Sequence, residues 1–260
     1  EVLEKIESYE KDLDNEDFSG SSELYAREID SDGFEALDII AKKIDGNSTI
    51  LDVGVGSGAL GKFIANKGGV ADGIEQHSNR VGGNLKFYRQ LVVGDLDTIN
   101  LVKELAQKRY DYIICADVLE HLRRPEYVLN QLRGMLNVNG RLLISVPNVG
   151  YAGVIASLIN GEFCYGDDGI LDRTHLKFYT RKELHKMLSA SGLHVLKEDD
   201  LRKDLRVSEF SSSLSSLTEA QRELLVLNHP DALTYQFIIE AGDGTSFENQ
   251  KVKRKKLANK

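Results

Sequence analysis

The sequence predicts an α/β fold in which a doubly wound, mostly parallel sheet carries helices on both faces. Short apolar runs of strand length alternate with segments of helical periodicity between residues 33 and 148. A glycine-rich turn follows the first of these runs, and an acidic residue stands at the end of each of the first three. Two further runs after residue 190 bring the expected sheet to seven strands.

Length and composition fit one large or two small domains with a full core. The chain has 260 residues, of which 41% are hydrophobic, and a formal net charge of −8. That charge argues against a general nucleic-acid binder, although residues 251–256 are basic. Cys115 and Cys164 have no metal-ligand spacing and cannot build a disulfide framework, so a reducing cytoplasm is the expected location. No apolar run approaches the ~20 residues of a membrane span.

Apolar spacing and turn residues define the expected elements in order. Apolar residues recur at helical intervals between residues 33 and 44, and Ile50, Leu51 and Val53 form a short buried strand after that helix. Pro125 suits the first turn of a later helix, and Thr180 suits a helix cap. The other expected strands are 69–75, 88–93, 110–115, 141–146, 193–197 and 234–240, and the other expected helices are 62–66, 103–108, 125–136, 151–159, 181–190 and 218–227.

The turn after the first strand has the composition of a nucleotide cradle. Gly54, Gly56 and Gly58 place no Cβ in the way of a ligand, and a helix follows them. Asp52, directly before the turn, would repel a pyrophosphate but suits a ligand with an ammonium or sulfonium group. The pattern Gly56-x-Gly58-x-x-Gly61 also matches the dinucleotide fingerprint, with Glu75 as the ribose acid, so a nicotinamide enzyme is the competing hypothesis.

The later strands also end in polar residues. Glu75 ends the second strand, where a parallel sheet presents groups that can accept hydrogen bonds from ribose hydroxyls. Asp95 follows the third strand and could accept a hydrogen bond from an adenine amino group. The fourth strand leads into Ala116-Asp117-Val118-Leu119-Glu120-His121, and the fifth is closed by Pro147-Asn148.

As a set, these stretches resemble the motifs of class I methyltransferases that use S-adenosylmethionine (SAM), over about residues 33–148. The resemblance implies a Rossmann-like methyltransferase fold, SAM as the cofactor and S-adenosylhomocysteine as its product. It also implies a list of cofactor-binding residues: Asp52, Gly54, Gly56, Gly58, Glu75, Gln76, Asp95, Leu96, Ala116, Asp117 and His121.

The substrate is expected between the fifth strand and the helix at 181–190. Residues 160–169 form a loop long enough to cover the carboxyl edge of the sheet. The segment Leu171-Asp-Arg-Thr-His-Leu-Lys-Phe-Tyr-Thr180 resembles one in methyltransferases associated with bacterial glycosyltransferase and surface-polysaccharide gene sets. That resemblance implies a sugar or glycan substrate contacted by Tyr151, Arg173 and Tyr179, and a glycosyltransferase as a partner or fused domain.

The expected reaction is methylation of a sugar or glycan hydroxyl by in-line transfer. His175 is the candidate general base because its ordinary pKa lies near ~6.5, and Asp172 would orient its imidazole. No metal site is expected. Nucleic-acid targets are disfavoured because the three prolines are isolated and Cys115 lies within a strand. The alternatives are a small-molecule O- or N-methyltransferase of another substrate class and a SAM-binding module without catalysis.

The expected domain organisation has three parts. Residues 1–22 form a leader and linker, residues 23–242 the methyltransferase domain, and residues 243–260 a basic disordered tail. Within the domain, segments at about 150–180 and 199–217 are expected to cover the substrate site. The sequence gives no indication of the oligomeric state.

Overall fold

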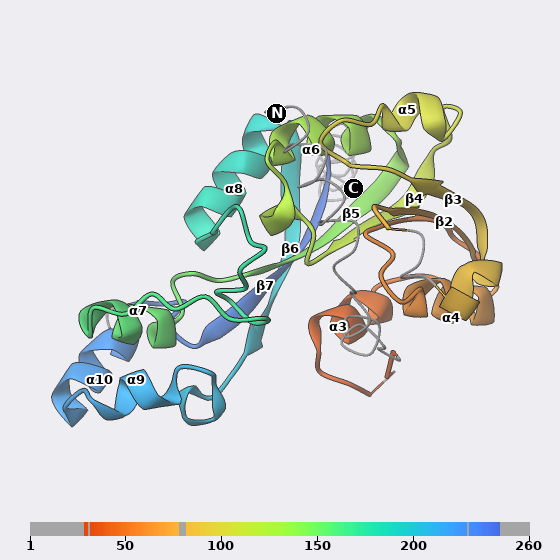
Figure 1. Ribbon diagram of the computed structural model, residues 1–260. Helices are drawn as coiled ribbons and strands as arrows, with labels where there is room; N and C mark the ends of the chain where they lie inside the picture. Colours follow the sequence, from red (N-terminus) through yellow and green to blue (C-terminus); the bar gives the residue numbers. More distant parts are fainter. Residues whose placement is uncertain (1–28, 31, 78–81, 228, 245–260) are drawn as a thin grey trace, which may run out of the picture.

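A seven-stranded sheet with the order β3-β2-β1-β4-β5-β7-β6 forms the centre of the protein (Figure 1). The structure is a computed structural model that describes residues 29–30, 32–77, 82–227 and 229–244. The expected leader at 1–22 and nearly all of the expected tail lie outside these residues. The strands are β1 (Thr49–Val53), β2 (Val70–Glu75), β3 (Tyr88–Val93), β4 (Tyr110–Ala116), β5 (Leu136–Pro147), β6 (Leu193–Arg202) and β7 (Thr234–Asp243).

Strand β7 runs antiparallel between β5 and β6, whereas the first five strands are parallel to one another. This is the Rossmann-like methyltransferase arrangement, and it confirms the predicted fold class. The sheet is covered on one face by α3 (Ala36–Lys42) and α4 (Ala59–Asn66), and on the other by α5 (Leu101–Glu104), α6 (Pro125–Gly134) and α8 (Arg181–Ala190) (Figure 1).

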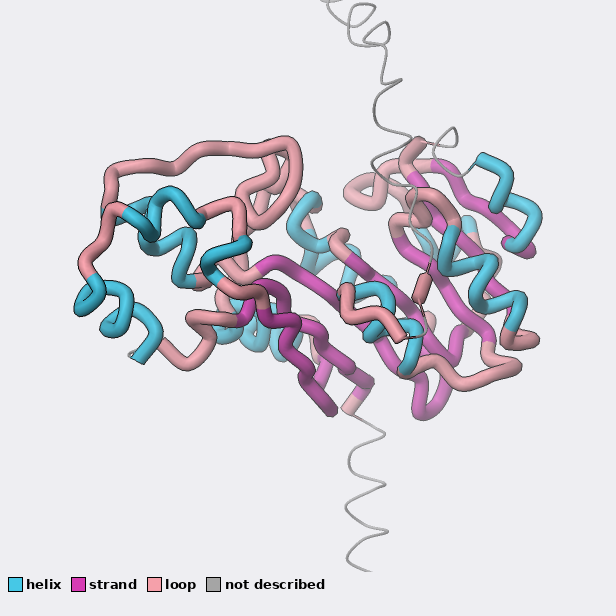
Figure 2. Tube along the Cα trace, turned by 90° about the horizontal axis from the view of Figure 1, so that it is seen from below, coloured by secondary structure: helices cyan, strands magenta, loops and turns pink. Residues whose placement is uncertain are grey.

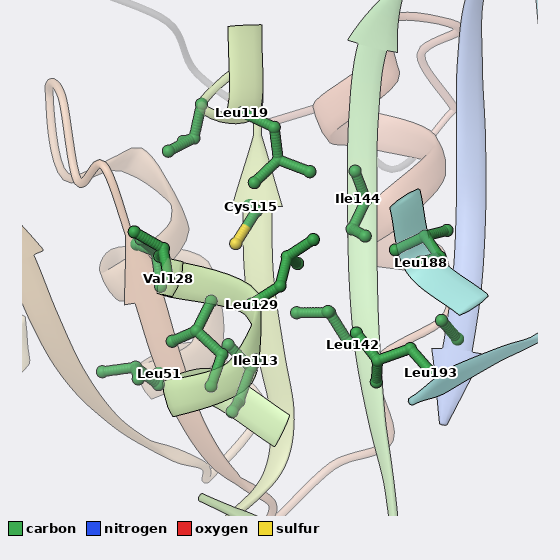
Figure 3. Packing of buried hydrophobic residues seen from close by; sticks show 14 of the residues in the cluster. Leu51, Ile113, Cys115, Leu119, Val128, Leu129, Leu142, Ile144, Leu188 and Leu193 are labelled. Carbon is green, nitrogen blue, oxygen red and sulfur yellow. The ribbon is translucent and has the colours of Figure 1, made fainter. Parts of the chain in front are cut away.

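Two hydrophobic layers hold the helices on the sheet. Successive strand residues point to opposite faces, so Ile113 packs under α6 while Ile114 packs toward α3 and α4. Figure 3 shows Leu129 of α6 and Leu188 of α8 on the face of the sheet to which Leu142 of β5 also points. Because both faces are covered, the central strands are apolar almost throughout, and this is why they could be recognised in the sequence.

Helices that follow β5 and β6 form a small lobe beyond the end of the sheet, which is clearest in Figure 2. It contains α7 (Ala152–Ile159), η5 (Leu205–Val207), α9 (Ser211–Ser215) and α10 (Glu219–Leu227). Its own core is built around Tyr151, Val154 and Phe210. None of the described helices has the length and hydrophobicity that a membrane span requires.

Several predicted boundaries differ from the observed ones, and three of them have a clear local reason. Strand β6 continues to Arg202, so the interval 199–217 begins as strand and goes on into helices of the lobe. Strand β5 already begins at Leu136, with Asn139 at φ 67° inside it where the pairing with β4 shifts register. Helix α5 ends at Glu104 because Ala106 and Gln107 take positive φ values.

Candidate active site

The glycine turn after β1 has the backbone geometry that requires glycine. Gly54, Gly56 and Gly58 have φ values of 79°, 53° and 77°, in the left-handed region that other residues rarely adopt. At Gly56 no described atom lies within 4 Å of the position that a Cβ would take. A Cβ on Gly54 would lie 2.8 Å from Val118, so the turn adjoins the segment that follows β4. This turn is a surface that a ligand can approach closely.

Asp52 is buried beneath the turn and is held by Tyr88. The Tyr88 hydroxyl donates to Asp52 Oδ2 at 2.6 Å and accepts from the Gly61 amide at 3.0 Å. A Cβ on Gly61 would lie 2.3 Å from the Tyr88 ring, so the third glycine of the fingerprint is required by packing. Burial raises the pKa of Asp52 to about 7; the hydrogen bond from Tyr88 opposes this rise and the negative charge of Glu75 adds to it.

Glu75 ends β2 next to the same turn. Its two carboxylate oxygens accept hydrogen bonds from the amides of Gly56 at 2.9 Å and His77 at 3.0 Å. Glu75 therefore fixes the shape of the glycine turn and keeps further lone pairs for a ligand. The neighbouring Gln76 is exposed.

The loop after β3 carries Asp95 and Leu96, both half-buried. The Asp97 amide donates to Asp95 Oδ1 at 2.8 Å, which closes a tight turn. The carboxylate of Asp97 in turn accepts the amides of Arg123 and Arg124 at 2.9 and 2.8 Å. Asp97, which the sequence did not single out, thus ties the loop after β3 to the segment after β4.

Strand β4 ends at Ala116, and Asp117 then turns the chain with a positive φ of 54°. The Asp117 carboxylate accepts hydrogen bonds from the Ser145 hydroxyl at 2.7 Å and the Gln236 amide at 2.8 Å. These bonds join the ends of β4, β5 and β7. Asp117 therefore shapes the turn, and its role toward the cofactor stays a prediction.

The turn leads into η4 (Leu119–His121), against which the segment before α8 is packed. The amides of Leu176 and Lys177 both donate to the Glu120 carbonyl, at 2.8 and 3.0 Å. The rings of His121 and His175 meet edge to face, with centroids 4.8 Å apart. Two histidines that are distant in the sequence therefore lie side by side.

Hydrogen bonds to carbonyl oxygens fix the tautomer of both histidines. Nδ1 of His175 lies 3.0 Å from the Ile170 carbonyl, and Nδ1 of His121 lies 3.3 Å from the Thr174 carbonyl. Since a carbonyl oxygen only accepts, and the Thr174 hydroxyl near His121 Nδ1 already donates to Asp172, the neutral form of each ring carries its proton on Nδ1 and its lone pair on Nε2. Burial, together with the neighbouring His175, lowers the pKa of His121, which favours its neutral form.

The predicted orienting role of Asp172 is wrong in this structure. Its carboxylate accepts from the amide and the hydroxyl of Thr174, at 2.7 and 2.6 Å, while the partner of His175 is the Ile170 carbonyl. Asp172 instead shapes the backbone turn that presents His175. Arg173 is exposed and pairs with Asp167 at 2.6 Å.

The two tyrosines predicted to bind substrate are also placed differently. Tyr151 is completely buried in the lobe core, and its hydroxyl donates to the Lys203 carbonyl at 3.0 Å. Tyr179 is buried against the main core and donates to the Leu119 carbonyl at 3.3 Å. Both rings pack in hydrophobic clusters, and the Tyr179 hydroxyl also holds the backbone of η4 through Leu119.

Sequence reasoning missed Tyr88 and Glu120. Tyr88 looked like an ordinary strand residue, and only the close approach at Gly61 reveals why an aromatic hydroxyl stands there. Glu120 lies directly before His121, yet its full burial depends on the segment that contains His175. The sequence signal that could have indicated Glu120 is its position beside His121, shortly after a predicted strand.

The sheet order, the glycine turn and the acids at the strand ends define a Rossmann-like methyltransferase that uses SAM. A family model described as a methyltransferase domain matches residues 25–198. The chain belongs to this methyltransferase domain family.

Curated relatives of the chain are ubiquinone biosynthesis O-methyltransferases. The protein from Aeromonas salmonicida (strain A449) is 29% identical over 164 residues, which cover 61% of this chain and 69% of the relative. The protein from Coxiella burnetii (strain RSA 331 / Henzerling II) is 24% identical over 150 residues, covering 56% and 64%. The chain thus spans about two thirds of the length of these relatives.

Solved structures show the same fold at low identity. A SAM-dependent methyltransferase from Archaeoglobus fulgidus superposes with a TM-score of 0.55 at 20% identity, covering 88% of this chain and 97% of that one. A putative methyltransferase from Bacillus halodurans C-125 also gives 0.55, at 15% identity, covering 80% and 98%.

The residues of the turn fit SAM. Bound SAM supplies a methyl group on a positively charged sulfur, already activated for transfer to a nucleophile. Asp52 offers a buried negative charge that suits a cationic ligand, and Glu75 offers free lone pairs beside the open face of Gly56.

We expect SAM affinity to depend on pH through Asp52. A cationic ligand favours the ionised carboxylate, and with a pKa of about 7 that form is scarce at pH 6 and dominant at pH 7.5. Calorimetric titration should therefore give roughly eightfold tighter binding at the higher pH. The Asp52→Asn variant should bind more weakly, with a flat profile. Equal pH dependence in both proteins would contradict this assignment.

Proposed function

We propose that the chain transfers the methyl group of SAM to a hydroxyl oxygen of a sugar or glycan and that His175 accepts the hydroxyl proton. The observation that carries this proposal is the orientation of the His175 ring, whose Nε2 lone pair is set by the bond from Nδ1 to Ile170. A neutral imidazole with a fixed Nε2 lone pair is the form that a general base requires.

The position of the histidine pair supports this role. His121 belongs to η4, and Val118, three residues earlier, touches the glycine turn at Gly54. His121 therefore belongs to the segment that contacts the glycine turn. An acceptor beside the two histidines would lie on the side where the cofactor is expected to bind. In this arrangement the protein positions the acceptor oxygen in line with the methyl group, and good alignment of two reactants is worth about 7 to 11 kcal/mol.

Two observations bear on the acceptor. The segment at 171–180 resembles one in methyltransferases of polysaccharide gene sets, which favours a sugar hydroxyl. The names of the ubiquinone biosynthesis relatives favour oxygen as the methylated atom, and they make a small aromatic hydroxyl the second candidate. Incubation of the chain with SAM and either nucleotide sugars or catechols, followed by mass spectrometry, separates the two. SAM binding without any methylated product from a broad acceptor panel would favour a non-catalytic module.

We expect His175→Ala to lower kcat by roughly 10²- to 10⁴-fold at neutral pH, because the hydroxyl would then lose its proton without a base. SAM affinity should change little, since most of the predicted cofactor residues lie at the ends of β1, β2 and β3. Single-turnover rates and calorimetric titration measure the two effects separately.

His185→Ala is a matched control, because this histidine lies on α8 and pairs with Glu198 on β6. The control should keep kcat near that of the parent chain. If His175→Ala also keeps nearly full kcat, the histidine is structural and alignment alone carries the reaction.

A further inference from the structure

Glu120, His121 and His175 form a compact cluster that the sequence spacing did not suggest. The donor atoms of these three side chains all lie within 4.8 Å of one another. Glu120 and His121 belong to η4, while His175 comes from the segment that packs on η4 through the Glu120 carbonyl. Three side chains of metal-binding type are thus brought together by the tertiary fold.

The carboxylate of Glu120 lacks any partner among the described residues. The side chain is 1% exposed, and neither of its carboxylate oxygens accepts or donates a hydrogen bond. Leaving a buried polar group unpaired costs on the order of 1 to 3 kcal/mol, and more when the group is charged. The Glu120 carbonyl accepts hydrogen bonds from the amides of Leu176 and Lys177, so the backbone is held in place. The side chain nevertheless has no hydrogen-bond partner among the described residues. A bound cation would remove this cost.

Both histidines are prepared as ligands in the manner of metal sites. A metal-binding histidine commonly donates its other ring N–H to a backbone carbonyl, which fixes the ring orientation. Nδ1 of His175 does so to Ile170, and Nδ1 of His121 does so to Thr174. The Nε2 atoms of both rings are therefore the available donors.

We propose that Glu120, His121 and His175 bind one divalent transition-metal ion. Two imidazoles and one carboxylate suit Zn²⁺ and Co²⁺, whereas Mg²⁺ prefers oxygen ligands. Around a tetrahedral Zn²⁺ the donor atoms would stand about 3.4 Å apart, so donors that now lie up to 4.8 Å apart have to approach one another by up to about 1.4 Å. Three protein ligands leave one position open, which is the arrangement of catalytic sites.

The metal site is an alternative to the base role of His175, and it does not rest on the proposed methyl transfer. A cation beside the acceptor lowers the pKa of a neighbouring hydroxyl, and Nε2 of His175 would then be a ligand. The base described above and the metal therefore use the same atom. Glu120 separates the two cases, because only the metal requires it.

The test is metal binding by the full chain after treatment with a chelator and desalting. We expect about one equivalent of Co²⁺, seen by its visible absorption, displacement of Co²⁺ by Zn²⁺, and no competition from Mg²⁺. Glu120→Gln and His175→Ala should each weaken binding at least about tenfold. His185→Ala and Cys164→Ser, which remove donors outside the cluster, should bind as the parent chain does.

Glu120→Gln should fold normally, because a neutral amide is easier to bury than an unpaired carboxylate. Its melting temperature without metal should match or exceed that of the parent chain. Unchanged metal affinity in this variant, or no stoichiometric binding by the parent chain, would overturn the proposal. Methyl transfer by a metal-free parent chain would support the proposed function without the metal. Metal binding without methyl transfer would support the metal site and contradict the proposed function.

Discussion

Replacing Glu75 with alanine is expected to weaken SAM binding by about 10- to 150-fold. The carboxylate fixes the glycine turn through the Gly56 amide and offers charged acceptors to the ligand. Hydrogen bonds to a charged group are worth about 1.5 to 3 kcal/mol, from which the fold-change follows. Calorimetric titration should show the same loss for SAM and S-adenosylhomocysteine, because both carry the adenosine that Glu75 would contact.

Two variants make this result interpretable. Glu75→Gln keeps an oxygen acceptor but loses the charge, so its affinity should lie between those of the parent chain and the alanine variant. Glu126→Ala removes an exposed acid of α6 and should bind SAM normally. If Glu75→Ala binds within a factor of two of the parent chain while remaining folded, Glu75 does not contact the cofactor.

Replacing Asp72 with alanine should cause the largest loss of stability, about 3 to 5 kcal/mol. Asp72 lies in the middle of β2 and is 0% exposed. Its carboxylate accepts hydrogen bonds from Arg89 at 2.6 and 3.0 Å, from Tyr110 at 2.8 Å and from Lys108 at 3.2 Å. Removing it leaves the buried Tyr110 hydroxyl without its acceptor, and it leaves exposed Arg89 and half-buried Lys108 without their carboxylate partner. Thermal unfolding should show a Tm lower by on the order of 10 °C.

The pH dependence gives this prediction a second readout. Burial alone would raise the pKa of Asp72, but the hydrogen bonds from Arg89, Tyr110 and Lys108 outweigh burial and lower it. A lowered pKa stabilises the fold above the unfolded value near ~3.9, and this stability is lost as the pH falls through the folded value. The Tm difference between the parent chain and Asp72→Ala should therefore shrink in acid.

Asp204→Ala is the control for this stability experiment, because that carboxylate pairs with Arg206 at an exposed site. Its unfolding curve should nearly match that of the parent chain. An Asp72→Ala protein that melts within about two degrees of the parent chain would contradict the structural role of the cluster.

The parts of the fold that sequence reasoning predicted are those governed by local patterns. Buried parallel strands are largely apolar, so β1 and β4 were located nearly to the residue. The glycine turn was predictable because positive φ values demand glycine. The start of β5 was missed because Asn139 and Gly140, which usually signal a turn between elements, lie within a strand that shifts register.

The acceptor side was predicted less well because it depends on tertiary contacts. His175 was recognised as chemically suitable, but its partner is a backbone carbonyl that no side-chain pattern encodes. Tyr151 and Tyr179 are amphipathic residues that could have faced a ligand as easily as a core, and the sequence cannot tell these environments apart. Glu120 became conspicuous only once its burial was known.

The hydrogen bonds of Asp97 link two segments of the site. One carboxylate anchors the loop expected to hold adenine and the backbone that leads out of η4 toward α6. A displacement of either segment is therefore transmitted to the other through this carboxylate and through the Arg124 side chain, which donates to the Asp97 carbonyl. Any change that the cofactor causes in acceptor affinity must be matched by an equal change that the acceptor causes in cofactor affinity. The Asp97 carboxylate thus gives cofactor and acceptor a physical link through which each can change the affinity of the other, whichever binds first.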